Sequence, residues 1–164
     1  MKGLELAPIE ETETEESSTE HVFQSLTSER RKEAQILASF TPEQVREIRN
    51  KQRILSSLAY FIGKDFGIPV LLNAPGAGWH WNFKENFIKI DTQDLLEKPI
   101  EYLRFVISHE GGHRRVSRTE FIPEEIWKQP GFPFLMNAIE DPRMNNFVAE
   151  SYPAFRSQIV LINL

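Results

Sequence analysis

The stretch Ser108-His109-Glu110-Gly111-Gly112-His113-Arg114 decides the fold of this 164-residue chain. It contains the pattern His-Glu-x-x-His, with the two histidines four residues apart. On an α-helix this spacing puts both imidazoles on one face, a turn apart, so both can reach a single metal ion. Glu110 follows the first histidine, where its carboxylate can act on a water molecule without binding the metal. The stretch therefore predicts a metal-binding helix.

The metal helix is expected to begin near Pro99 or Ile100 and to end near Ser117. Gly111 and Gly112 are poor helix formers, and each costs about 1 kcal/mol relative to alanine. Because they lack side chains, they allow another element or a substrate to approach the helix closely. Zinc binding contributes ~10 kcal/mol or more in a tight site, which would offset this cost.

The third ligand of the predicted metal site is expected to be a carboxylate. A catalytic zinc site needs three protein ligands and an open position, but no histidine follows His113 and the chain has no cysteine. Glu140 is the preferred residue, because it lies in an apolar segment where an unpaired charge is costly to bury. Asp141 is the alternative, although Asp-Pro-Arg is also a good helix start. The other, less favoured downstream carboxylates are Glu120, Glu124, Glu125 and Glu150.

Two motifs carry a resemblance to a known family. Residues 109–113, followed by a helix that carries Glu140, resemble the zincin metallopeptidases, specifically the gluzincins. The stretch Asn137-Ala138-Ile139-Glu140-Asp141-Pro142-Arg143 is similar to a pattern in metallopeptidase-like domains found next to von Willebrand factor A domains. The resemblance covers about residues 79–150. It implies a zincin-like fold, a Zn²⁺ ion held by His109, His113 and Glu140, and a peptide or protein substrate.

Three functional hypotheses follow. In the first, the protein is a zinc-dependent peptidase in which Glu110 takes a proton from a zinc-activated water as that water attacks the scissile carbonyl. In the second, it is a non-catalytic or degenerate zinc domain that serves as a protein-interaction module in a larger assembly. The third, a nucleic-acid-binding helix around residues 46–53, is disfavoured because its arginines alternate with acidic and polar residues.

The charge of the chain is concentrated at its N-terminus. Residues 1–20 hold seven glutamates and one lysine, a net charge of −6, whereas the whole chain carries −5, so the remaining residues are near neutral. The sequence therefore predicts a disordered acidic tail over residues 1–22 and one metallopeptidase domain over residues 23–164. A near-neutral body argues against nucleic-acid and anionic-membrane partners.

The sequence also bears on cellular location. It has no apolar run long enough to span a membrane, and its N-terminus lacks the basic and apolar regions of a secretory signal. A cytoplasmic protein is expected. An apolar helix is predicted to begin near Ala154 and reaches Leu164 without a cap, so we expect the chain to be the front part of a longer protein. The oligomeric state is not indicated.

The remaining pattern predicts an α+β fold, with a small, partly antiparallel sheet against several helices and the metal between the His109 and Glu140 helices. Thr41-Pro42 is a strong helix start. The predicted helices cover residues 28–39, 42–63, 124–128 and 132–150, and the predicted strands cover residues 68–72, 79–83 and 87–91. Pro142 predicts a kink or break in its helix. An extended peptide can pair with a hairpin edge strand, and His80 on that hairpin is interpreted as structural rather than as a ligand.

Overall fold

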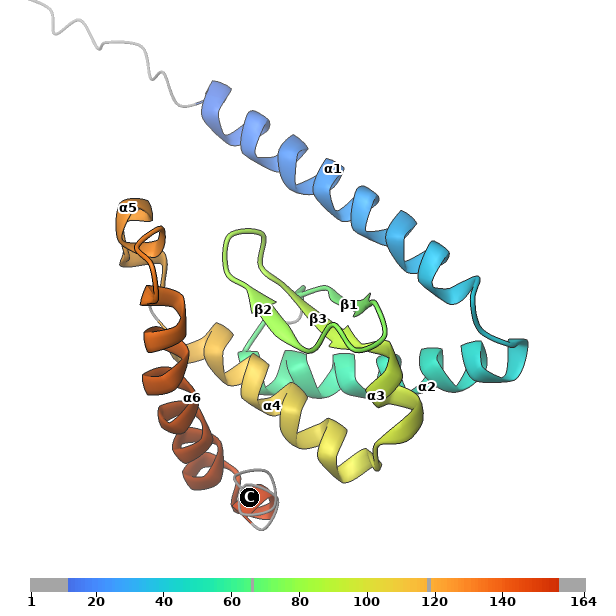
Figure 1. Cartoon of the computed structure of the whole chain (residues 1–164). Coiled ribbons are helices and arrows are strands. Elements are labelled where there is room, and N and C mark those ends of the chain that lie inside the picture. Colours follow the sequence, from blue (N-terminus) through green and yellow to red (C-terminus); the bar gives the residue numbers. More distant parts are fainter. Residues whose placement is uncertain (1–11, 66, 118, 157–164) are drawn as a thin grey trace, which may run out of the picture.

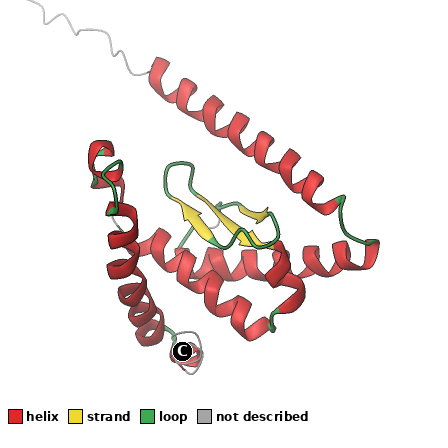
Figure 2. Cartoon of the chain, in the orientation of Figure 1, coloured by secondary structure: helices red, strands yellow, loops and turns green. Residues whose placement is uncertain are grey.

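The computed structural model describes residues 12–156 except 66 and 118. The helices are α1 (Thr12–Leu37), α2 (Pro42–Gly63), α3 (Thr92–Glu97), α4 (Ile100–Val116), α5 (Glu124–Trp127) and α6 (Phe132–Ser151), with short 3-10 helices at Thr119–Phe121 (η1) and Pro153–Phe155 (η2). The strands are β1 (Val70–Asn73), β2 (His80–Asn82) and β3 (Phe87–Asp91). The fold is α+β, as predicted. Figure 1 shows α2 and α4 under a small sheet and α1 above it, and Figure 2 shows how far helices outweigh strands.

The described strands form one sheet in the order β1-β3-β2. β1 runs parallel to β3, with Val70 opposite Ile88, and β2 runs antiparallel to β3, with Trp81 opposite Ile88. The prediction of a small, partly antiparallel sheet is confirmed. β2 is an edge strand, because its other side pairs with no further strand in the described part of the chain.

The hydrophobic core lies between one face of the sheet and the helices α2 and α4. Its fully buried side chains include Ile48, Leu55 and Ala59 from α2, Ile88 and Ile90 from β3, and Leu103 and Ile107 from α4. α2 begins with the predicted cap, in which the Gln44 N–H donates to Thr41 Oγ1 over 3.3 Å and the Thr41 N–H donates to Gln44 Oε1 over 3.0 Å. This reciprocal pair satisfies two backbone donors at the start of the helix.

α1 is much longer than the sequence predicted. It was expected to begin at Ser28, but it begins at Thr12, so residues 12–22 of the predicted disordered tail are helical. Glutamate is a good helix former, and acidic residues interact favourably with the positive end of the helix dipole. A Glu-rich stretch at the start of a helix therefore favours extension. The rest of the predicted tail, residues 1–11, lies outside the described residues.

Polar contacts attach α1 to the free edge of β1 and to Lys89 of β3. The buried carboxylate of Glu33 accepts hydrogen bonds from the Leu72 N–H over 2.7 Å and from Gln52 Nε2 over 2.9 Å. One turn earlier, Glu29 forms an ion pair of 2.5 Å with Lys89 of β3. α1 is therefore held along the β1 edge of the sheet by hydrogen-bonded carboxylates, whereas one face of the sheet packs on α2 and α4 through apolar contacts.

The two glycines of the metal helix let two neighbouring helices approach α4. A Cβ atom on Gly111 would lie 3.3 Å from the Ile62 side chain and 3.4 Å from the backbone nitrogen of Gly63, both in α2. A Cβ atom on Gly112 would lie only 2.4 Å from Met144 Sδ in α6. The two glycines therefore allow close packing of α4 against α2 and α6. Close approach of another element was one of the two explanations that the sequence suggested, the other being close approach of a substrate.

α6 carries the remaining predicted site residues and runs from Phe132 to Ser151 without the break predicted at Pro142. Proline removes one intrahelical hydrogen bond, but burial of Met144 against α4 stabilises the helix just beyond it. The apolar helix predicted from Ala154 starts within η2, and residues 157–164 lie outside the described residues. None of the described helices combines the length and apolarity that a membrane crossing requires.

Candidate metal centre

Two histidines of α4 form the middle of the candidate site. His109 and His113 lie one turn apart, as their spacing predicted, with their Nε2 atoms 2.9 Å apart. Each side chain is 15% exposed. Another face of α4 holds Leu103 and Ile107 in the core, and burial of this apolar stripe fixes the rotation of the helix about its axis. The two imidazoles are thereby directed toward α6.

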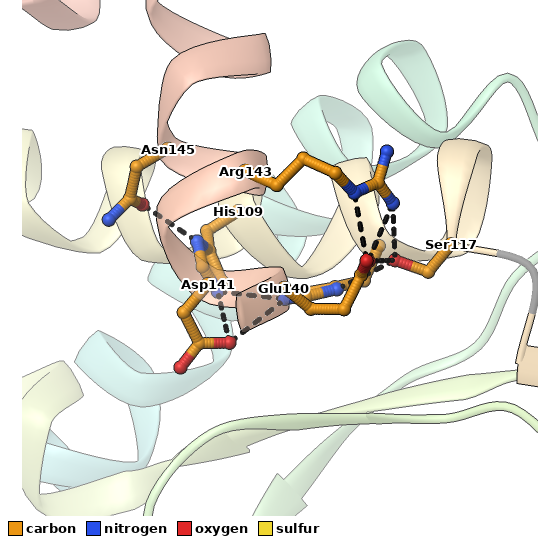
Figure 3. Close-up of polar contacts among 7 residues, drawn as sticks. His109, Ser117, Glu140, Asp141, Arg143 and Asn145 are labelled. Carbon is orange, nitrogen blue, oxygen red and sulfur yellow. Dashed lines mark hydrogen bonds and ion pairs between the residues drawn. The ribbon is translucent and has the colours of Figure 1, made fainter. Parts of the chain in front are cut away.

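Asp141 of α6 joins the histidines. Its Oδ1 atom lies 3.4 Å from His113 Nε2 and 3.7 Å from His109 Nε2. One ligand atom from each of the three residues lies within 4.8 Å of the others, as Figure 3 shows for His109 and Asp141. Two histidines and one carboxylate are a donor set of catalytic zinc sites, so the chemistry of these residues fits a zinc ion.

Glu140, the ligand that the sequence favoured, has other partners in the structure. Its carboxylate accepts hydrogen bonds from Arg143 Nε over 2.8 Å, from Arg143 Nη2 over 2.5 Å and from Ser117 Oγ over 2.8 Å (Figure 3). Neighbouring positions on a helix are about 100° apart around its axis, so Glu140 and Asp141 leave α6 in different directions. The structure brings Asp141 to the histidines, and it does not bring Glu140 there.

Hydrogen bonds at Nδ1 orient both histidines. His109 Nδ1 lies 2.9 Å from Asn145 Oδ1, which can only accept, so this nitrogen carries the ring proton. His113 Nδ1 lies 2.9 Å from Ser117 Oγ, and because the Ser117 hydroxyl donates to Glu140, it accepts from the histidine. Each ring thereby turns its Nε2 atom toward Asp141, where that nitrogen can serve as a metal ligand.

Asn145 and Ser117 were not predicted from the sequence as partners of the histidines, although their spacing from the candidate ligands indicates this role. Asn145 lies four residues after Asp141, and Ser117 lies four residues after His113, so each shares a helix face with a candidate ligand. Asn137, which flanks Glu140 on its helix face, instead lines the cleft beside Asp141.

Glu110, the predicted general base, is buried beside the three candidate ligands and is only 8% exposed. The backbone N–H of Trp81 in β2 donates a hydrogen bond to its carboxylate. Burial raises the pKa of Glu110 to about 7, the Trp81 hydrogen bond opposes the rise, and the nearby charge of Asp141 adds to it. The edge strand thus holds this carboxylate in position.

His113 is neutral at neutral pH. Burial lowers its pKa to about 4, the neighbouring His109 lowers it further, and the Glu140 carboxylate only partly opposes these effects. A neutral imidazole keeps a lone pair for a metal ion.

The site opens into a cleft of about 290 Å³ between the β2–β3 hairpin, α4 and α6. The hairpin contributes His80, which lines the cleft but is not part of the His109, His113 and Asp141 group. The whole lining consists of Trp79, His80, Trp81, Phe83, His109, Glu110, His113, Ser117, Thr119, Trp127, Asn137 and Asp141. Among the described residues, no lysine or arginine lines the cleft.

The chain was compared with known proteins at the level of family, sequence and structure. No protein-family model, curated protein or solved structure matches it. The function of the site is therefore inferred from its residues and their geometry.

Proposed function

We propose that this protein is a zinc-dependent metallopeptidase whose metal is held by His109, His113 and Asp141. The observation that carries the proposal is the convergence of these ligands next to a buried carboxylate, Glu110, in one cleft. A structural zinc site is usually closed by four protein ligands, whereas a catalytic site has three and an open position. Three candidate ligands facing a cleft therefore favour catalysis.

Glu110 and the residues that hold the histidines would have separate roles in the reaction. A bound zinc ion polarises a carbonyl oxygen and makes a water molecule acidic enough to ionise near neutral pH. Glu110 would take a proton from the attacking water and would return it to the leaving amine as the peptide C–N bond breaks. Asn145 and Ser117 keep the two histidines in the orientation that ligation requires.

The edge strand β2 supports a peptide as the substrate. It lines the cleft through His80 and Trp81, next to Glu110. The exposed edge of a sheet can bind an extended peptide through backbone hydrogen bonds. A peptide lying along β2 would pass the metal group, so its scissile carbonyl could reach both the metal and Glu110.

The first test of the proposal is the zinc content of purified protein, measured by elemental analysis. We expect one zinc per chain, lost in His113→Ala and Asp141→Ala but retained with lower affinity in Glu140→Ala. Loss with Glu140→Ala and retention with Asp141→Ala would make Glu140 the third ligand. Absence of zinc from the wild type after reconstitution would overturn the proposal.

The second test addresses the chemistry. Glu110→Gln keeps the shape of the side chain but removes its basicity. It should reduce hydrolysis of a peptide mixture by about 10²–10⁴-fold, while the zinc content stays at the wild-type value. Full activity in this variant would rule out Glu110 as the base.

The alternative function is a zinc-binding interaction module without catalysis. The observation in its favour is an apolar surface on α6, where Phe134 is 81% exposed, Leu135 55% and Ile139 57%. Exposed apolar patches of this kind often mark protein contacts. Bound zinc without hydrolysis of any peptide in the mixture would favour this alternative.

A further inference from the structure

All three tryptophans of the chain line the cleft, and one of them differs from the other two. Trp79 Nε1 donates to Asp94 Oδ2 over 2.8 Å, and Trp81 Nε1 donates to Asn86 Oδ1 over 3.4 Å. Trp127 Nε1 is buried, and in the described part of the structure it has no hydrogen-bond partner. A buried donor without a partner costs about 1–3 kcal/mol, so its presence at a cleft requires a reason.

A second polar atom in the same cleft has the same property. Thr119 Oγ1 is buried and lacks a hydrogen-bond partner within the described residues. The described residues have three buried side-chain atoms of this kind, and two of them, Thr119 Oγ1 and Trp127 Nε1, belong to residues that line the cleft. The third, Arg114 Nε, belongs to a residue outside the lining. Unsatisfied hydrogen-bonding capacity is therefore concentrated at the cleft.

Aromatic rings pack against Trp127. Phe83, at the end of the β2–β3 hairpin, stacks on Trp127 of α5 with ring centroids 5.3 Å apart, and Trp81 packs edge-on against Phe83 at 6.3 Å. Lys84 and Glu124 add an ion pair of 3.7 Å between the hairpin and α5. This end of the cleft is thus walled by aromatic rings, and the lining residues that the structure describes include no positively charged side chain.

We propose that Trp81, Phe83, Thr119 and Trp127 form a subsite that binds a bulky apolar side chain of a peptide, an aromatic one by preference. The Trp127 N–H and the Thr119 hydroxyl bind a backbone carbonyl oxygen of the same peptide. Pairs of aromatic rings stabilise a complex by more than the burial of their apolar area alone. The peptide carbonyl would supply a hydrogen-bond acceptor for the Trp127 N–H and the Thr119 hydroxyl, which have none among the described residues of the free protein. This inference rests on the proposed peptidase function and defines its substrate class.

The subsite changes when it is filled. Trp127 Nε1 and Thr119 Oγ1 are both covered in the free protein, so binding requires the two side chains to turn toward the cleft when the peptide carbonyl arrives. Because every tryptophan of the chain lines the cleft, intrinsic fluorescence reports this binding directly.

The test measures the binding of blocked tripeptides, acetyl-Gly-X-Gly-amide with X as Phe, Leu, Ala or Glu. The full chain carries Glu110→Gln so that the peptides stay intact, and affinity is followed by tryptophan fluorescence and calorimetry. The Phe and Leu peptides should bind at least about tenfold more tightly than the Ala peptide, because they bury more apolar area, and the Glu peptide should bind no better than Ala. Equal affinity for all four would overturn the proposal.

Two further variants isolate the hydrogen bonds. Thr119→Val keeps the shape and removes the hydroxyl, and Trp127→Phe keeps an aromatic ring and removes the N–H. Each should weaken binding of the Phe peptide by about fivefold. Thr119→Val should leave the Tm of the free protein unchanged or higher, since it removes an unpaired buried hydroxyl. Thr27→Val, on α1 outside the cleft, is the matched control and should not alter affinity.

The outcomes separate this proposal from the peptidase proposal. If Thr119→Val lowers the Tm and leaves affinity unchanged, the hydroxyl is structural and the subsite is wrong. If the peptides bind as expected but zinc-loaded wild-type protein does not hydrolyse them, the subsite stands and the peptidase proposal fails. If hydrolysis occurs without preference among the four peptides, the peptidase proposal stands and the subsite fails.

Discussion

Single residues outside the ligand set decide how well the candidate metal centre is organised. Asn145 and Ser117 each hold one histidine through its Nδ1 atom. A histidine that is already held loses less rotational freedom when it binds a metal. The Ser117 bond is itself supported by the Glu140 carboxylate and Arg143.

Asn145→Ala is expected to weaken zinc binding by about 10–100-fold, because partners behind metal ligands typically have effects of this size. His109 would keep its place on α4 but lose the acceptor that orients its ring. Zinc affinity measured by competition with a chelator tests this expectation. The neighbouring exposed residue provides the control, Asn146→Ala, which should leave affinity unchanged. Equal affinities for the two variants would show that Asn145 does not position His109.

At the scale of the elements, the site depends on how closely α6 approaches α4. Gly112 allows this approach, because any Cβ atom there would overlap Met144. Asp141 lies three residues before Met144 on α6, so pushing Met144 outward also moves the third candidate ligand. The Gly112–Met144 contact is thus linked to the metal group, because both lie between α4 and α6.

Gly112→Ala is expected to destabilise the protein by about 1–3 kcal/mol through overpacking. The higher helix propensity of alanine offsets about 1 kcal/mol of this loss. Gly111→Ala should cost less, because its neighbours lie 3.3 Å or more from the added carbon. Urea unfolding gives both values.

A double-mutant cycle tests the cause. In a Met144→Ala background the added methyl group has room, so Gly112→Ala should become neutral or stabilising there. Strictly additive effects would mean that Met144 is not the obstacle.

At the scale of the whole molecule, α1 is attached to the sheet by charged and polar groups rather than by a large apolar face. Glu33 and Glu29 provide the main contacts, with the Leu72 N–H and with Lys89. Burial raises the pKa of Glu29, but hydrogen bonds from Lys32 and Lys89 and their charges outweigh burial, so the pKa is below its ordinary value of 4.5.

The attachment of α1 is therefore expected to depend on pH. Because the pKa of Glu29 is lower in the folded protein than in the unfolded chain, its ionised carboxylate stabilises the fold. This stabilisation is complete at a pH above the unfolded-state pKa, and it is lost as the pH falls through the folded-state pKa. At neutral pH, Glu29→Gln should lower the free energy of unfolding by about 1.5 kcal/mol. On acidification below about pH 4.5, the free energy of unfolding of this variant should fall less than that of the wild type. Urea unfolding across this range measures both effects. Glu125→Gln, at an exposed site on α5, is the control, and parallel pH curves for wild type and Glu29→Gln would contradict the expectation.

The sequence alone determined the features that depend on a few neighbouring residues. The spacing of His109 and His113 placed both on one helix face, and Thr41-Pro42 marked the start of α2, because helix periodicity and capping act within one or two turns. Alternation and turn residues likewise predicted the β2–β3 hairpin and its position in a partly antiparallel sheet. The α+β class followed from these local patterns together.

Only the tertiary structure decided which carboxylate meets the histidines. Glu140 and Asp141 are adjacent in sequence and both carry a carboxylate. Their roles depend on how α6 crosses α4, and the Gly112–Met144 contact contributes to that crossing. In the observed crossing, the Glu140 carboxylate binds Arg143 and Ser117. The Asp141 carboxylate instead lies next to His109 and His113. The Glu110 contact with the Trp81 N–H arises in the same way, from segments distant in sequence. Local patterns carry no information on such contacts, because packing of the whole chain determines them.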